Sequence, residues 1–233
     1  MDKRLGLCSA YSFLYGVHKP GKLLDRAAAL GVKTVSVCDI NNVYGVHGFL
    51  EEAKERNIRP IIGAALSLQA SPALPPCLYA FVENREGFAK LCEILSEKNK
   101  DKDRDKDRNR DKEKPGIKSG GKILSMLRED STGLVLVSAS EEILSGLAGR
   151  VKRLYAAITP DDLGGIGPHR KLSLPLAFLD TSVFLDRDDY PVHRVLRAIG
   201  LNKTIGSLGP DETVKEGCGI FKSASELRGR LNS

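Results

Sequence analysis

RLGLCSAYSFLYG (residues 4–16), VSVCDINNVYG (35–45) and RPIIGAA (59–65) are the three segments that decide the fold of this chain. Each segment starts with a short apolar run that predicts a β-strand and ends in a turn of small and polar residues. The sequence between them has the spacing of amphipathic helices. Strands that alternate with helices in this way are typical of a parallel α/β sheet or barrel.

The alternation continues along most of the chain, and seven apolar segments have the β-branched character of strands. They are residues 4–8, 34–38, 60–68, 77–82, 133–138, 153–158 and 175–180. Helical patterns are at residues 19–30, 46–57, 86–96, 122–129, 140–150 and 189–199. This order predicts parallel strands joined by right-handed crossovers, in an α/β fold with a distorted seven-stranded (β/α)7 barrel. In such a barrel, functional side chains lie where strands end, and the residues near those ends are Cys8, Asp39, Ala65, Ser140 and Asp180.

The composition is typical of a soluble globular protein. The chain has 233 residues, of which 41% are hydrophobic, and this length allows one large domain with a substantial core. No apolar run approaches the ~20 residues of a membrane span, and no signal peptide pattern follows Met1. The five cysteines include no C-x-x-C pair, which favours free thiols in a reducing cytoplasm. A formal charge of +6 permits contact with nucleic acid, but the basic residues are spread along the chain and predict no dedicated DNA-binding face.

Residues 97–114 differ from the rest of the chain, because nine Lys or Arg and seven Asp or Glu alternate there without an apolar residue. Such a segment buries too little apolar area to offset its ordering entropy. We expect a disordered or frayed-helix insertion at about residues 97–120, inside a barrel domain of residues 1–199. Residues 200–233 are a C-terminal extension, in which Ser223 and Glu226 have the spacing of a helix capping box.

The three opening segments resemble the N-terminal PHP (polymerase and histidinol phosphatase) domain of the bacterial DNA polymerase III alpha subunit and its error-prone relatives. The motifs of that family read roughly His-x-His-x-His-Ser-x-Tyr-Ser, Thr-Asp-His-Gly-Asn-x-x-Gly and Lys-Pro-Ile-Ile-Gly-x-Glu. The residues that match them here are Ser9, Tyr11, Ser12, Gly16, Asp39, Asn42, Gly45, Pro60, Ile61, Ile62 and Gly63. The resemblance implies a distorted seven-stranded barrel, two or three divalent metal ions, and a C-terminal extension like the segment that leads to the polymerase body.

The metal ligands of that family are replaced in this chain. The ligand positions of the three motifs hold Arg4, Gly6, Cys8, Ile40 and Ala65. Later ligand positions hold Cys77, Ser140 and, at the end of the last strand, residues 180–184. A shift of that last alignment by one residue places Asp180 in the role of the family's aspartate.

Only Asp39 keeps a side chain that suits a metal ion at its expected position. Metal-assisted phosphoester hydrolysis needs several imidazole and carboxylate ligands, and one carboxylate does not hold a metal cluster. Asp39 also has a structural interpretation, because it can accept backbone N–H bonds and fix the turn into the next helix. The resemblance therefore implies a PHP fold whose metal centre has been dismantled.

Our first hypothesis is a PHP-like domain without catalytic residues, cofactor or bound metal ion. It would act as a structural or interaction module in DNA replication or repair synthesis. Its expected partner is a DNA polymerase catalytic subunit or another replication or repair protein, and not a membrane. Whether DNA is contacted directly stays open.

The alternative is a metal-dependent phosphoesterase or 3′–5′ exonuclease with an altered metal site. Asp39, Cys8, His47 and Asp180 supply two carboxylates, a thiolate and an imidazole, which could hold one zinc ion, or manganese or magnesium in its place. For His47, a surface or capping role in the first turn of a helix is the competing interpretation. A third hypothesis is a decayed fragment without a role, although the intact apolar periodicity argues against it.

Overall fold

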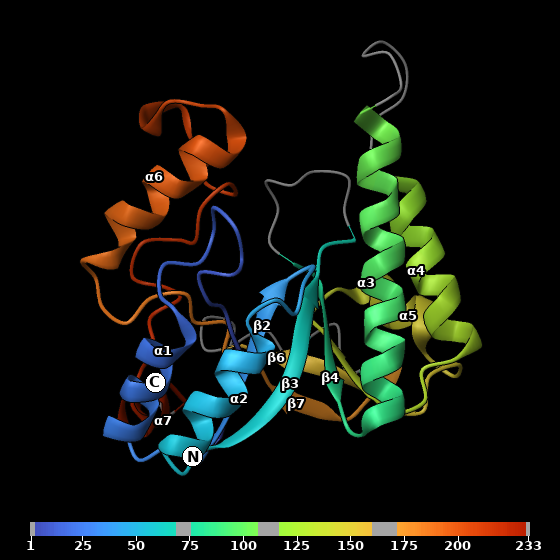
Figure 1. The fold of residues 1–233 in the computed structure, drawn as a ribbon, viewed down its shortest axis with the longest axis horizontal. Helices are drawn as coiled ribbons and strands as arrows, with labels where there is room; N and C mark the ends of the chain where they lie inside the picture. Colours follow the sequence, from blue (N-terminus) through green and yellow to red (C-terminus); the bar gives the residue numbers. More distant parts are fainter. Residues whose placement is uncertain (1–2, 69–75, 107–116, 160–171, 232–233) are drawn as a thin grey trace.

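The computed structural model describes residues 3–68, 76–106, 117–159 and 172–231 (Figure 1). The strands are β1 (Lys3–Leu7), β2 (Thr34–Ile40), β3 (Arg59–Leu66), β4 (Leu78–Val82), β5 (Leu134–Ser138), β6 (Leu154–Ile158) and β7 (Leu176–Phe178). The helices between them are α1 (Pro20–Ala29), α2 (Val46–Glu55), α3 (Arg85–Lys106), α4 (Ile117–Glu129) and α5 (Glu141–Leu147). After the last strand come α6 (Asp189–Leu201), the 3₁₀ helix η2 (Ile205–Ser207) and α7 (Ala224–Leu231). The predicted α/β fold with seven strands is confirmed.

The seven strands form one sheet in which spatial order follows chain order, from β1 to β7. Neighbours are parallel except at β4, which runs antiparallel to both β3 and β5. The prediction of parallel strands throughout is therefore wrong at β4. A parallel pair needs a crossover of about a dozen residues or more, usually a helix, and no amphipathic helical pattern lies between Leu66 and Leu78. The short connection reverses the chain direction and brings the start of β4 beside the end of β3.

The chain after β7 returns to β1 and nearly closes the barrel. The Asp180 amide donates a hydrogen bond to the Leu5 carbonyl (2.8 Å), and the Cys8 amide donates to the Ser182 carbonyl (2.9 Å). Between Arg4 and Leu7, the pairing of β1 with β2 shifts in register. The distorted barrel that the sequence predicts is thus present, and the ends of β1 and β7 lie side by side.

Alternate strand residues separate the interior of the barrel from its helical cover. In β4, Leu78 and Ala80 pack outward against helices, whereas Tyr79 and Phe81 pack inside the barrel. The interior cluster consists of Cys38, Ala65, Tyr79, Phe81, Val137, Ala157 and Leu179. On the outside of the barrel, α1 and α2 cover β1 and β2, and α3, α4 and α5 cover β4 to β6 (Figure 1).

The C-terminal extension packs into the core of the barrel domain. Phe221 is fully buried and belongs to the cluster that also holds Leu7, Leu23 and Phe49 from β1, α1 and α2. The capping box predicted for α7 is confirmed. The Ser223 hydroxyl accepts a hydrogen bond from the amide of residue 226 (3.2 Å), and the Ser223 amide donates to the carboxylate of that glutamate (2.6 Å).

The charged insertion is helical at both of its ends. α3 continues through Lys106 and α4 begins at Ile117, so the described parts of residues 97–120 are helical. Ion pairs support these ends, since Glu97 pairs with Lys100 (3.6 Å) on α3 and with Lys122 on α4. Residues 107–116 lie outside the described residues. Within the described ranges, no helix is both long and apolar enough to cross a membrane.

Candidate functional site

A cavity of about 540 Å³ lies at the mouth of the barrel, where β1, β2 and β3 end and β4 begins. Five positions that the resemblance assigns to metal ligands meet on its wall, and they hold Gly6, Cys8, Ile40, Ala65 and Cys77. The antiparallel direction of β4 explains why Cys77, which precedes its strand, joins residues at the ends of the others. The fold therefore keeps the geometry of a site at this mouth.

The side chains at these positions do not suit a metal centre. Glycine, isoleucine and alanine offer no side-chain donor. Gly6 has φ +98°, and a Cβ atom there would lie 2.8 Å from Leu179 Cδ1, so a histidine would strain the backbone and collide with Leu179. Among the described residues, no group of three or more His, Cys, Asp or Glu is placed to hold a metal ion. The residues present therefore do not fit the metal cluster that the family resemblance implies.

Asp39 holds the loop after β1 against β2. Its Oδ1 atom accepts hydrogen bonds from the Ser9 amide (2.9 Å) and the Ser12 hydroxyl (2.8 Å), and the Ser9 hydroxyl donates to both carboxylate oxygens. The Ser12 oxygen in turn accepts a hydrogen bond from the Ile40 amide (3.0 Å). Burial raises the pKa of Asp39, and the hydrogen bonds from Ser12 and Ser9 oppose that rise. Asp39 thus accepts a backbone N–H bond, as its structural interpretation expected, but it holds the loop after β1 and not the turn into the next helix.

Arg4 and Asp180 form a buried ion pair where β7 returns to β1. Arg4 Nε lies 3.4 Å from Asp180 Oδ2, and the two side chains are 0% and 2% exposed. Asp180 also accepts hydrogen bonds from the amide and hydroxyl of Ser182, and Arg4 Nη2 donates to the Lys222 carbonyl (2.9 Å). Burial raises the pKa of Asp180, although the hydrogen bond from Ser182 and the positive charge of Arg4 both act to lower it. A guanidinium thus supplies the positive charge that neutralises this carboxylate.

Four of the five cysteines line the cavity, and they are Cys8, Cys38, Cys77 and Cys218. None of the five cysteines, all of which lie in the described residues, forms a disulfide. Burial, followed by the nearby Asp39 carboxylate, raises the pKa of Cys8 far above its usual value. Burial also raises the pKa of Cys38 to about 12. Both thiols therefore stay protonated at neutral pH and behave as small apolar groups instead of thiolate ligands.

The four residues of the alternative zinc site are not brought together as one described cluster. Cys8 lines the cavity, but Asp39 is engaged by two serines and Asp180 by Arg4. The His47 side chain is 86% exposed on α2 and lies 3.5 Å from Glu51, which is a surface position. Ser140, at another family ligand position, instead accepts a hydrogen bond from the Ile143 amide (3.4 Å) and caps α5.

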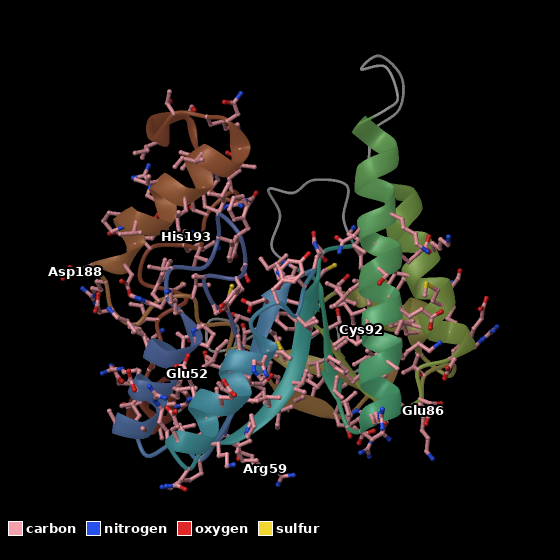
Figure 2. All side chains as sticks on the ribbon, viewed as in Figure 1. Glu52, Arg59, Glu86, Cys92, Asp188 and His193 are labelled. Atoms are coloured by element: carbon pink, nitrogen blue, oxygen red, sulfur yellow. The ribbon has the colours of Figure 1, made fainter. Side chains whose placement is uncertain are left out.

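His193 does not line the cavity, but it contacts the backbone of two residues that do. It is fully buried on α6, on the side that faces the loop after β1 (Figure 2). Its Nδ1 atom lies 2.8 Å from the Tyr15 carbonyl, and Nε2 accepts a hydrogen bond from the Val214 amide (3.2 Å). Burial lowers the pKa of His193 to about 4, so the ring stays neutral and can make both contacts. Val214 belongs to residues 210–219, which we call the C-terminal wall because several of them line the cavity.

Three parts of the cavity were not identified from the sequence. Alternation in β2 and β4 places Cys38 and Tyr79 inside the barrel, but their position at its open end depends on strand register. In that register, Cys38 pairs with Gly63, and Tyr79 pairs with Ala65. The C-terminal wall carries no motif, and only the tertiary fold brings it to the mouth.

Comparison with known proteins places this geometry in a family. A family model described as the PHP domain matches residues 5–165, which is well over half of the chain. An error-prone DNA polymerase of Anaeromyxobacter sp. (strain K) is 36% identical over 89 residues, covering 38% of this chain and 8% of the polymerase. An error-prone DNA polymerase of Mycobacterium tuberculosis (strain ATCC 25618 / H37Rv) is 37% identical over 94 residues, covering 38% of this chain and 9% of the polymerase.

A solved structure from Bifidobacterium adolescentis, of a protein with an inferred metal-dependent phosphoesterase activity, has a TM-score of 0.48 and 13% identity to this chain. The similarity covers 77% of this chain and 86% of that protein. The matches to the polymerases span less than a tenth of their length. The match to the PHP family model is consistent with the seven-stranded barrel of the structure. The chain therefore belongs to the PHP domain family and is related to the DNA polymerase III alpha subunit.

Proposed function

We propose that this PHP domain is a non-catalytic structural and interaction module that serves DNA replication or repair synthesis in the cytoplasm. The observation that carries the proposal is the wall of the barrel mouth, where five family ligand positions converge but hold Gly6, Cys8, Ile40, Ala65 and Cys77. A phosphoesterase of this type needs metal ions to activate water and to neutralise phosphate charge. These five positions offer two thiols and no imidazole or carboxylate for that task.

An exposed apolar stripe on α6 supports the interaction role. Val192, Val195 and Ile199 follow each other at i, i+3 and i+7, and they are 48%, 42% and 61% exposed. Residues at this spacing share one face of a helix. We propose that a polymerase catalytic subunit covers the α6 stripe of this chain.

The absence of catalysis is tested by measuring bound metal and DNA hydrolysis together. The purified protein is loaded with Zn²⁺ or Mn²⁺, desalted and analysed for metal per chain, and then incubated with 3′-labelled single-stranded DNA. We expect well under one metal ion per chain and no cleavage. Cys8→Ala changes a thiol that lines the cavity, and Asp39→Asn changes the carboxylate that interacts with it. Cys92→Ala removes a thiol on α3 that does not line the cavity (Figure 2). Stoichiometric metal or cleavage that Cys8→Ala and Asp39→Asn lose and Cys92→Ala keeps would overturn the proposal.

That outcome would establish the second candidate function, a phosphoesterase or 3′–5′ exonuclease with an altered metal site. The specific observation in its favour is that four thiols line one cavity. Thiols are good zinc ligands once deprotonated. The elevated pKa of Cys8 and Cys38 counts against this function, because binding would require the loss of protons that burial holds in place.

The interaction role is tested by mixing the protein with the polymerase alpha subunit of the same organism, expressed without its own PHP domain. Complex formation is followed by analytical size exclusion. The double variant Val195→Ser/Ile199→Ser is expected to weaken the complex at least tenfold. The control Leu176→Ser removes an equally exposed leucine from β7, outside α6, and should leave binding unchanged. Equal binding by all three proteins would exclude the α6 stripe as the docking surface.

A further inference from the structure

The cavity at the barrel mouth has the size and the lining of a small-molecule site. Its volume of about 540 Å³ lies within the roughly 300–1,000 Å³ that is usual for ligand pockets. Apolar side chains from all round the mouth line it, and they are Ile40, Ala65, Leu179, Val183 and Val214. The protonated thiols of Cys8 and Cys38 add to this apolar surface.

The Tyr79 hydroxyl in the cavity wall is not engaged by the described residues. Tyr79 is only 8% exposed, and none of the described residues makes a hydrogen bond to its hydroxyl. The groups that interact electrostatically with this hydroxyl are Tyr15, Cys38, Cys8 and Cys77, and all four also line the cavity. The hydroxyl therefore lies at the cavity wall. A ligand in the cavity can accept a hydrogen bond from this hydroxyl without displacing a described protein partner.

The charges around the cavity do not favour an ionic ligand. Among the described lining residues, charged side chains come only from the C-terminal wall, as Asp211, Glu212 and Lys215. The Glu212 carboxylate is occupied by the Lys203 ammonium and by the Gly209 amide (2.7 Å). The strands contribute no cation for a phosphate and no carboxylate for a metal ion.

We propose that this cavity binds an uncharged small organic molecule, with an apolar body and an oxygen or nitrogen that accepts a hydrogen bond from the Tyr79 hydroxyl. The barrel mouth, where the family resemblance implies a metal site, would then bind an uncharged organic molecule instead of metal ions. The C-terminal wall closes over the ligand, and the contact of His193 with the Val214 amide holds that wall in place. The inference rests on the proposed absence of a metal centre.

The test uses prodan, an uncharged naphthyl ketone whose fluorescence responds to the polarity around it and to hydrogen bonding at its carbonyl. The protein contains no tryptophan, so its own emission does not obscure the probe. We expect saturable binding of one probe per chain with a shift of the emission to shorter wavelength. Tyr79→Phe removes only the donor hydroxyl and should weaken binding about tenfold, the effect of one lost hydrogen bond. Ala65→Leu fills the cavity and should abolish binding.

Two control variants separate the cavity from the surface. Tyr44→Phe removes a hydroxyl from a tyrosine that is 76% exposed, and Phe13→Ala removes an aromatic ring that is 84% exposed. Both should bind prodan like the unaltered protein. Absence of saturable binding, or equal binding by Tyr79→Phe and the unaltered protein, would overturn the inference. Metal analysis of the same sample separates the two proposals: bound metal contradicts the non-catalytic function, whereas a metal-free protein that ignores prodan contradicts this inference alone.

Discussion

Arg4 occupies a position where the PHP family carries a metal-binding histidine, and in this chain it forms an ion pair with Asp180 instead. Both side chains are almost completely withdrawn from solvent. A buried charge pair gains little net stability from its attraction, since both ions lose hydration, but either charge left alone is costly. The pair therefore makes each residue depend on the other. It also ties the start of β1 to the end of β7, where the barrel closes.

Arg4→Met is expected to lower the free energy of unfolding by about 3–5 kcal/mol, because it leaves the Asp180 carboxylate buried without its cation. The double variant Arg4→Met/Asp180→Asn removes both charges, so its free energy of unfolding should fall clearly less than that of Arg4→Met. Urea unfolding followed by circular dichroism measures both. Equal losses in the single and double variants would show that the charge pair is not the source of the effect.

His193 predicts a pH dependence of stability. Burial lowers its pKa to about 4, compared with 6.5 in an unfolded chain. Between these values the unfolded state binds a proton and the folded state does not, so stability falls as the pH drops from about 6.5 to about 4. The groups around the ring are Tyr15, Val214, Phe184 and Arg197. Burial and the positive charge of Arg197 favour the neutral ring, whereas the hydrogen bond with the Tyr15 carbonyl opposes this lowering of the pKa. The shift corresponds to a loss on the order of 3 kcal/mol.

The measurement is urea unfolding from pH 7 to pH 4.5, for the unaltered protein and His193→Gln. Glutamine can donate to Tyr15 and accept from Val214, but it does not titrate. Its stability should start lower at pH 7 and then change less with pH than that of the unaltered protein. Parallel pH profiles for the two proteins would contradict a neutral, buried His193.

At the scale of elements, the loop between β1 and α1 is built around close backbone contacts. The Gly16 amide donates a hydrogen bond to the Ser12 carbonyl (2.9 Å), and Asp39 binds the hydroxyls of Ser9 and Ser12 in the same loop. A Cβ atom on Gly16 would lie 1.8 Å from the Ser9 carbonyl oxygen. The glycine at this position therefore permits a chain approach that no larger residue allows.

Gly16→Ala is expected to destabilise the protein by about 1–3 kcal/mol or more, because the loop must shift away from its contacts with Asp39. Gly48→Ala is the matched control. Gly48 lies in α2 with open space where its Cβ would be, so alanine there should stabilise the helix by about 0.5–1 kcal/mol. Thermal unfolding should therefore move in opposite directions for the two variants. A shift of the same sign and size in both would contradict the crowded loop.

At the scale of the whole molecule, the C-terminal extension packs against the N-terminal part of the barrel and supplies part of its core. Phe221 is fully buried beside β1, α1 and α2, and the Arg4 guanidinium lies 5.7 Å from the centre of its ring. The C-terminal wall also borders the cavity. The extension is therefore needed both for the stability of the barrel domain and for the shape of its mouth.

Phe221→Ala should lower the free energy of unfolding by about 3–5 kcal/mol, as is usual when a large buried aromatic side chain is removed. The same substitution at Phe13, which is 84% exposed, should change it by less than about 0.5 kcal/mol. Chemical denaturation of the two variants gives both values. If Phe221→Ala were as harmless as Phe13→Ala, the extension would not be part of the folding unit.

The amino-acid sequence by itself determined the seven strands, the α/β class, the family and, among the strand-end residues expected at the mouth, Cys8 and Ala65, which line the cavity. Each of these follows from local patterns: apolar periodicity, turn residues such as Gly16, and motif positions such as Asp39. Only the tertiary structure decided the antiparallel direction of β4, the ion pair between Arg4 and Asp180, and the contribution of Tyr79 and the C-terminal wall to the cavity. These features depend on strand register and on contacts between residues far apart in the chain. A local pattern states which face of a strand is apolar, but not which distant residue it will meet.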